Sequence, residues 1–118
     1  MGQLSASVLD TLHGRPAAGV AIDLHRLDGK GGRALLLKTA TDASGRTNPP
    51  LLDAVTYRTG SYEVEFHLGA YFQAAGAPLA DPPFLDVITV RIQLAEPDGD
   101  YRLPIIAAPW GYQLYRGS

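Results

Sequence analysis

Apolar and polar residues alternate along several short segments of the chain, and this alternation predicts β-strands. In residues 4–9, Leu4, Ala6 and Val8 fall on one side, while Ser7 falls on the other, as in a half-buried strand. Residues 20–27 and further segments follow the same period of two. The expected strands cover residues 4–9, 20–27, 33–41, 60–66, 84–94, 101–107 and 112–116.

Glycine and proline separate these segments. The chain has 13 glycines and 9 prolines, which mark turns at intervals of about ten residues, as in an all-β domain. Seven or eight short strands with this spacing favour a β-sandwich. Residues 70–75 are the one segment expected to form a helix. At about one and a half turns, such a helix holds only when it packs against the rest of the fold.

Composition narrows the class of protein. A chain of 118 residues, 46% hydrophobic and 19% charged, is expected to fold as one domain with a packed core. The net charge is −2 and the basic residues are scattered, so we expect no nucleic-acid partner. The absence of cysteine excludes a disulfide framework, a thiolate nucleophile and any cysteine-ligated metal.

The N-terminal residues show no basic region followed by an apolar run, so no signal peptide is predicted. No apolar stretch approaches the roughly 18 residues that cross a bilayer. We therefore expect a cytoplasmic protein without a membrane partner. His13, His25 and His67 lack metal-ligand spacing. Each is expected to be a surface histidine, and neither a metal nor a cofactor is predicted.

The C-terminal end carries the most chemistry. An apolar, proline-bounded segment at residues 103–109 leads to a final Tyr115-Arg116-Gly117-Ser118. A phenol, a guanidinium and a hydroxyl at the end of a strand can present polar groups to a ligand. A solvated chain end is the other interpretation, because termini are commonly loosely ordered.

Three segments together carry a resemblance to a known family. They are residues 4–10 with 14–20 (Leu-Ser-x-x-Val-Leu-Asp, then Gly-Arg-Pro-Ala-Ala-Gly-Val), residues 41–47 (Thr-Asp-x-x-Gly-Arg-Thr), and residues 103–118 (Leu-Pro-Ile-Ile through Pro-Trp-Gly-Tyr to Tyr-Arg-Gly-Ser). The chain resembles the transthyretin-related proteins, in particular the 5-hydroxyisourate hydrolases of urate breakdown. The terminal Tyr-Arg-Gly-Ser is specific for the hydrolase branch over the hormone-binding branch.

The resemblance implies a fold and an assembly. It implies an all-β, transthyretin-like two-sheet β-sandwich of about eight strands with one short helix, as a single domain over residues 1–118. It also implies a homotetramer, built as a dimer of dimers, with active sites in a channel between dimers. The implied activity, in purine metabolism, is hydrolytic opening of an oxidised purine ring or of a related small anionic or cyclic substrate.

The resemblance also assigns candidate site residues. The family site uses a histidine on the first strand, an arginine after the Asp-x-x-Gly turn, a histidine on the penultimate strand, and the terminal Tyr-Arg-Gly-Ser. The arginine matches Arg46 and the terminus matches in full, but the two histidines fall on Ser7 and Arg102. The candidate catalytic residues are Ser7, Arg46, Arg102 and Tyr115. The candidate substrate-binding residues are Arg46, Arg102, Arg116, Gly117 and Ser118.

The chemistry of these residues points to anion recognition. Arginine stays charged and serine has no useful basicity, so neither replaces a histidine in proton transfer near neutral pH. Three guanidiniums around one pocket would bind a carboxylate, phosphate or enolate through paired N–H donors and stabilise an oxyanion. Tyr115 could supply a proton if the arginines lower its pKa. Ser7 as a nucleophile lacks a visible base.

Alternation predicts how these groups meet. Ser7 and Arg102 lie opposite the core faces of their strands, and neighbouring strands of one sheet would show both to the same channel. Arg102 has a plainer alternative, a salt bridge to Asp98 or Asp100. At the level of function, three alternatives stay open: a non-catalytic small-molecule-binding protein, a family member repurposed in a biosynthetic pathway, and a purely structural module.

Overall fold

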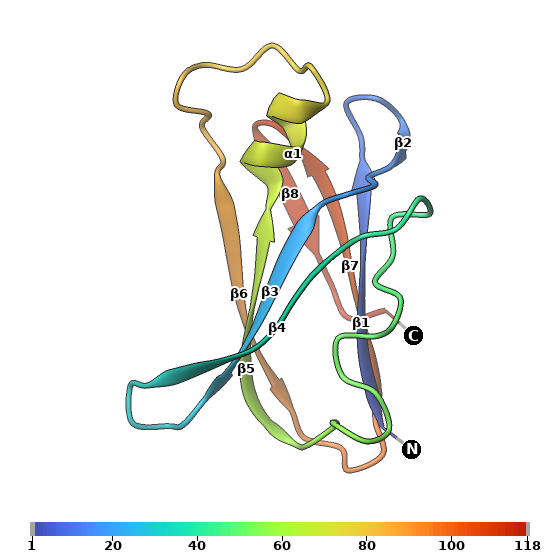
Figure 1. Cartoon of the computed structure of the whole chain (residues 1–118), viewed down its shortest axis with the longest axis vertical. Helices are drawn as coiled ribbons and strands as arrows, with labels where there is room; N and C mark the ends of the chain where they lie inside the picture. The colour runs from blue at the N-terminus through green and yellow to red at the C-terminus, as the bar shows by residue number, and fades with distance from the viewer. Residues whose placement is uncertain (1, 118) are drawn as a thin grey trace.

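The computed structural model describes residues 2–117 and shows eight strands and one helix among them (Figure 1). In chain order they are β1 (Gln3–Asp10), β2 (Arg15–Pro16), β3 (Ala21–Leu27), β4 (Arg33–Ala40), β5 (Gly60–His67), α1 (Leu68–Ala74), β6 (Val87–Leu94), β7 (Asp100–Ala108) and β8 (Gly111–Leu114).

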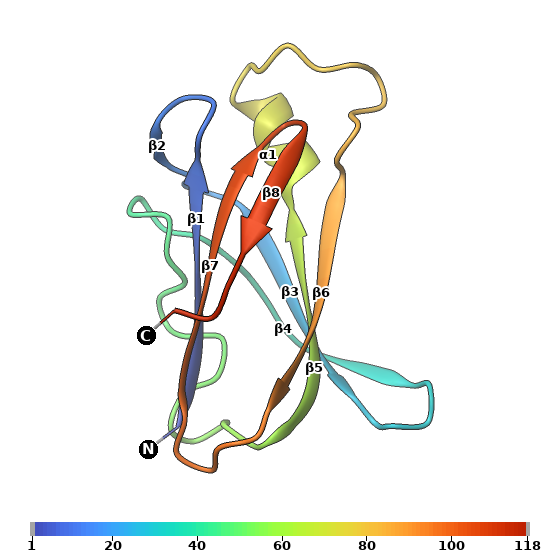
Figure 2. The same ribbon diagram turned by 180° about the vertical axis from the view of Figure 1, so that it is seen from behind.

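The strands form two four-stranded sheets, in the orders β2-β1-β7-β8 and β4-β3-β5-β6. The two sheets face each other, and α1 lies at one end between them (Figures 1 and 2). The β1–β7 pair is parallel, whereas the other strand pairs are antiparallel. This architecture confirms the two-sheet β-sandwich of about eight strands with one short helix.

The core lies between the inner faces of the two sheets and follows the predicted alternation. On β1, the side chains of Leu4, Ala6 and Val8 are buried, and on β5 those of Tyr62 and Phe66 are buried. Full burial of one such large apolar side chain contributes roughly 1.5–3 kcal/mol. The alternation of β1 therefore fixes which of its side chains remain available to a ligand.

Among the boundaries that differ from the sequence prediction, the starts of α1 and β6 are linked by one hydrogen bond. The helix begins at Leu68 instead of residue 70, and β6 begins at Val87 instead of residue 84. The amide of Gly69 donates to the carbonyl oxygen of Asp86 at 2.9 Å. The backbone just before β6 therefore bonds to the first turn of α1 instead of extending the sheet, and Phe84 is left exposed.

A tight turn against β1 positions the segment that carries Arg46. The Oδ1 atom of Asp42 accepts hydrogen bonds from the amides of Ser44 (2.9 Å) and Arg46 (3.1 Å). The amide of Val8 donates to the carbonyl oxygen of Gly45 at 2.8 Å. Ser7 and Arg46 consequently form an isolated antiparallel bridge.

Gly45 permits this close approach. Its φ of +76° is in the left-handed region, and a Cβ at this position would lie 2.6 Å from the carbonyl oxygen of Val8. Gly14 has a similar φ of +66°, but a Cβ there would meet nothing within 4 Å. A side chain at either glycine would strain the backbone, but only a side chain at Gly45 would also overlap with a neighbouring strand.

We predict that Gly45→Ala destabilises the protein more than Gly14→Ala does. Each change costs about 1–2 kcal/mol for the left-handed backbone, and Gly45→Ala costs a further ~1–3 kcal/mol for the overlap with β1. Urea unfolding at one fixed protein concentration measures both losses, because assembly makes apparent stability depend on concentration. Equal losses for the two variants would show that the turn does not press on β1.

Candidate functional site

A polar hollow of about 560 Å³ lies on the outer face of the β1–β7 pair. Five of the candidate residues line it: Ser7, Arg46, Arg102, Tyr115 and Gly117. The prediction that Ser7 and Arg102 share one surface is confirmed, because both line this hollow from neighbouring parallel strands.

Three parts of the chain build the hollow. In the parallel register, Ser5 is opposite Arg102 and Ser7 is opposite Pro104. The bridge to β1 adds Arg46. The C-terminal segment then returns beside β7 (Figure 2), where the amide of Gly117 donates to the carbonyl oxygen of Arg102 at 2.8 Å. Gly117 is therefore bonded to the strand that carries Arg102.

The hollow is electropositive. Two guanidiniums line it, and no aspartate or glutamate among the described residues does so. Within residues 2–117, Arg46 forms no ion pair with a carboxylate. Arg102 lies with Nη2 3.3 Å from Oδ2 of Asp100, which is one of the pairings that the sequence left open.

Asp100 is itself held in place. Its Oδ1 atom accepts a hydrogen bond from Nε2 of Gln3 at 3.0 Å. The hydrogen bond from Gln3 and the charge and hydrogen bond of Arg102 keep the pKa of Asp100 below its usual value. This carboxylate offsets part of the charge of Arg102 and leaves Arg46 as the guanidinium without a carboxylate partner in the described hollow.

The structure differs from the expectation for Arg116. Its Nη1 atom is 3.4 Å from Oε1 of Glu96, and its guanidinium carbon is 4.1 Å from the centre of the Tyr101 ring. Side chains alternate along an extended segment, so Tyr115 and Gly117 face the hollow while Arg116 does not. Two guanidiniums, instead of three, surround the hollow in the described chain. Ser118 lies outside the described residues.

Sequence reasoning missed four polar lining residues: Gln3, Ser5, Thr47 and Asn48. The alternation of side chains along β1 could have identified Gln3 and Ser5 as lining residues, because both share the outer face of β1 with Ser7. Asn48 follows Arg46 by two residues in an extended segment, and the same argument applies to it. These residues add amide and hydroxyl groups that can bind the polar edge of a ligand.

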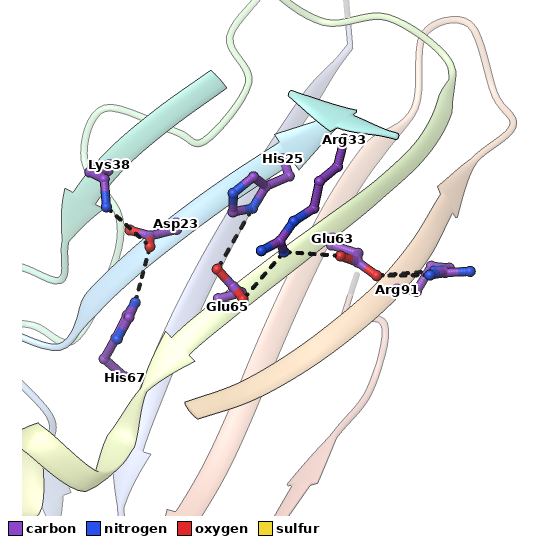
Figure 3. A network of polar contacts seen from close by, with 8 residues as sticks. All are labelled: Asp23, His25, Arg33, Lys38, Glu63, Glu65, His67 and Arg91. Atoms are coloured by element: carbon purple, nitrogen blue, oxygen red, sulfur yellow. Dashed lines mark hydrogen bonds and ion pairs between the residues drawn. The ribbon is translucent and has the colours of Figure 1, made fainter. Parts of the chain in front are cut away.

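No histidine lines the hollow among residues 2–117. Figure 3 shows two of the three histidines on the outer face of the other sheet, where Nε2 of His67 is 3.1 Å from Oδ2 of Asp23. Nδ1 of His25 is 3.7 Å from Oε1 of Glu65. The expectation of a surface histidine is wrong for His25, whose exposed fraction is 9%, because side chains of the neighbouring strands lie beside it.

His13 lies elsewhere, in a cluster of hydrogen bonds around the buried carboxylate of Asp10. Asp10 is 0% exposed and accepts hydrogen bonds from the His13 amide (3.0 Å), from Nδ1 of His13 (2.6 Å) and from the Tyr71 hydroxyl (2.7 Å). Burial alone would raise the pKa of Asp10, but these hydrogen bonds outweigh burial and lower it. Asp10 thereby ties the first turn and α1 to the end of β1.

Two further features limit the chemistry. In the part of the chain that the structure describes, no three histidine, aspartate or glutamate side chains gather as a metal site. Among those residues, too, no helix is long and apolar enough to span a bilayer.

The fold and the hollow define a two-sheet β-sandwich protein with an open, electropositive hollow on one sheet. A family model described as the HIUase/Transthyretin family matches residues 4–117. The chain belongs to the HIUase/Transthyretin family. This confirms the resemblance that supplied the candidate residues.

Three similar proteins illustrate the range of the family. The protein named 5-hydroxyisourate hydrolase 2 of Rhizobium meliloti (strain 1021) is 44% identical over 117 residues, which cover 99% of this chain and 97% of that relative. The crystal structure of (S)-allantoin synthase has a TM-score of 0.91 and 37% identity; the match covers 99% of this chain but 44% of that one. Sea bream transthyretin in complex with thyroxine has a TM-score of 0.85 and 29% identity, and the match covers 98% of this chain and 94% of that one.

We predict that Asp10→Asn lowers stability near neutral pH, by about 1–3 kcal/mol, because buried donors lose their charged acceptor. The folded-state pKa of Asp10 is below its unfolded value. Its carboxylate therefore stabilises the fold above the unfolded pKa, near 3.8, and this contribution is lost as pH falls through the lowered folded value. Thermal unfolding from pH 7 to pH 3 measures the difference between wild type and variant, which should shrink below about pH 4.

The exposed Asp81 supplies the control for this measurement. Asp81→Asn should leave stability within about 0.5 kcal/mol of wild type, as is usual for surface positions. A difference between Asp10→Asn and wild type that stays constant down to pH 3 would contradict a stabilising buried carboxylate.

Proposed function

We propose that this protein hydrolyses 5-hydroxyisourate, or a related small cyclic anion, in the breakdown of oxidised purines. The observation that carries the proposal is the single hollow shared by Ser7, Arg46, Arg102, Tyr115 and Gly117. The curated relative from Rhizobium meliloti bears the name 5-hydroxyisourate hydrolase 2, which supports the same class of reaction.

The reaction would open the ring with water. Water adds to a ring carbonyl carbon, the adjoining C–N bond breaks, the departing nitrogen takes a proton, and the carbon becomes a carboxylate. Arg46 and Arg102 would bind the anionic substrate and stabilise the oxyanion that forms on the attacked carbonyl. The hydroxyls of Ser7 and Tyr115 would hydrogen-bond the substrate edge.

The weak point of such a site is proton transfer. In this proposal, Ser7 and Arg102 stand where the family has histidines, and neither side chain exchanges a proton readily near neutral pH. Loss of general acid–base help typically lowers a rate by about 10²–10⁴-fold. Solvent water would then carry the protons, so the protein would act mainly through binding and oxyanion stabilisation.

The proposal includes an assembly. A homotetramer, built as a dimer of dimers, would face the hollows of two subunits toward each other across a channel in a cytoplasmic protein. The sheet orders support this arrangement, since β8 ends one sheet and β6 ends the other. Free edge strands are available to pair with a second copy.

A non-catalytic binding protein is the second candidate. The absence of an imidazole from the hollow, as far as residues 2–117 show, favours it specifically. Sea bream transthyretin is a similar protein whose structure holds a bound thyroxine, so at least one similar protein binds a small molecule. In this second candidate, the two guanidiniums would hold an anion without turnover.

We predict that the protein accelerates the decay of freshly generated 5-hydroxyisourate and that Arg46→Ala lowers kcat/KM more than tenfold, because a charge-assisted contact to the substrate is lost. Absorbance of the substrate over time, against its spontaneous decay, measures the rate. Arg91→Ala is the matched control, since Arg91 pairs with Glu63 on the other sheet (Figure 3).

The outcomes separate the two candidates. A rate equal to spontaneous decay would remove 5-hydroxyisourate as the substrate. Saturable binding of small anions without turnover, weakened by Arg46→Ala and not by Arg91→Ala, would establish the binding protein instead.

We also predict that the double variant Ser7→His/Arg102→His hydrolyses 5-hydroxyisourate faster than wild type, by up to about 10²–10⁴-fold. Imidazoles at these positions would restore a proton acceptor and donor in the hollow. The pH profile of kcat/KM is the second measurement, because a histidine should introduce a limb near its pKa. If neither the rate nor the profile changes, proton transfer is not what limits this site.

A further inference from the structure

A second hollow, of about 710 Å³, lies between α1, the β2 turn and the start of β3. It shares no lining residue with the first hollow. Figure 1 shows α1 and β2 together at the end of the sandwich away from the N-terminus. A volume in the range of about 300–1,000 Å³ is typical of small-molecule sites.

Small side chains leave this space open. Ala18 and Ala21 line it from the β2–β3 side, and Ala70 and Ala74 line it from α1. Both helix positions are exposed, so the space is not filled by the core. Methyl groups facing each other across a gap offer an apolar surface that a ligand of matching size would cover favourably.

Arg15 adds an exposed guanidinium to the lining of the alanine-lined hollow. Arg15 and Tyr71 both line the hollow, and the Tyr71 hydroxyl donates to the buried Asp10 at 2.7 Å. The Asp10 carboxylate is also contacted by His13 at 2.6 Å, and it does not line the hollow. Among the described residues, Arg15 has no ion pair with a carboxylate, and no aspartate or glutamate lines the space.

His67 is the second basic side chain on the lining, after Arg15. Its Nε2 atom is held by Asp23, which also lies 3.4 Å from Lys38 (Figure 3). His67 therefore already has a carboxylate partner in Asp23. Arg15 is the side chain of the lining that remains available to pair with an anionic ligand. An apolar surface lined by one guanidinium without a carboxylate partner among the described residues suits a carboxylate attached to a compact apolar body.

We propose that the alanine-lined hollow is a second ligand site, which binds a small monocarboxylate with an apolar body. Arg15 pairs with the carboxylate, and the alanines of α1 and of the β2–β3 segment cover the body. The first hollow differs in chemistry, because hydroxyl, amide and guanidinium groups line it. The two sites therefore select different anions on one subunit.

The test uses the full chain labelled with ¹³C at alanine methyl groups. 3-Phenylpropionate is titrated in, and its neutral amide serves as the comparison probe. We expect saturable shifts of Ala18, Ala21, Ala70 and Ala74, with affinity at least about tenfold lower for the amide, because the neutral amide cannot form an ion pair with Arg15. Ala6 lines the first hollow and should not move.

Matched variants locate the site. Arg15→Gln should weaken binding about tenfold, and Ala74→Trp should block the hollow. Gln73→Trp is the control for the tryptophan, since Gln73 is exposed on the same helix but does not line the space. Arg46→Ala should leave this binding unchanged, which keeps the result independent of the proposed hydrolysis.

Four results would each overturn the proposal. They are no saturable binding, equal affinity for the acid and the amide, shifts at Ala6 instead of the four alanines, and equal loss of binding in Ala74→Trp and Gln73→Trp.

Discussion

The parallel pairing of β1 with β7 is the constraint on which the site depends. Strands adjacent in a sheet share the period of two, so one register decides which side chains of both strands face outward together. With Ser5 opposite Arg102, the outer faces of the two strands form one continuous surface, which lines the first hollow. The Gly45 turn hydrogen-bonds to the backbone of β1, and the C-terminal segment hydrogen-bonds to that of β7. If one of the two strands shifted its register by one residue, its outward-facing side chains would point into the core instead.

Much of the fold follows from local pattern. The alternation of Leu4, Ala6 and Val8 identified a buried face, and the structure has that face in the core. The boundaries of α1 and β6 did not follow, because they depend on the hydrogen bond between Gly69 and Asp86. Nothing in a local pattern records a contact between residues so far apart in sequence. The burial of His25 is similar, since neighbouring strands supply the side chains that cover it.

The site was predictable where periodicity and resemblance agreed. Ser7, Arg46 and Arg102 were each placed by strand or turn, and all three line the hollow. Arg116 belonged to a matching motif, but its place on the opposite side of an extended segment turns it toward Glu96. A motif states which residues occur together, whereas the backbone decides which of them point the same way. The alanine-lined hollow left no motif, because small residues on separate segments carry no signal until the fold brings them together.

Charge balance around the first hollow follows from the same register. Two guanidiniums beside one small space repel each other, and that repulsion is strongest where little water separates them. Asp100 lies two residues before Arg102, on the same face of β7, and Gln3 holds it from the neighbouring strand. This carboxylate offsets Arg102 from the side, whereas Arg46 forms no ion pair with a carboxylate among residues 2–117. The positive charge of the hollow therefore depends on Asp100 and Gln3, near the ends of β7 and β1, as well as on Arg46 and Arg102.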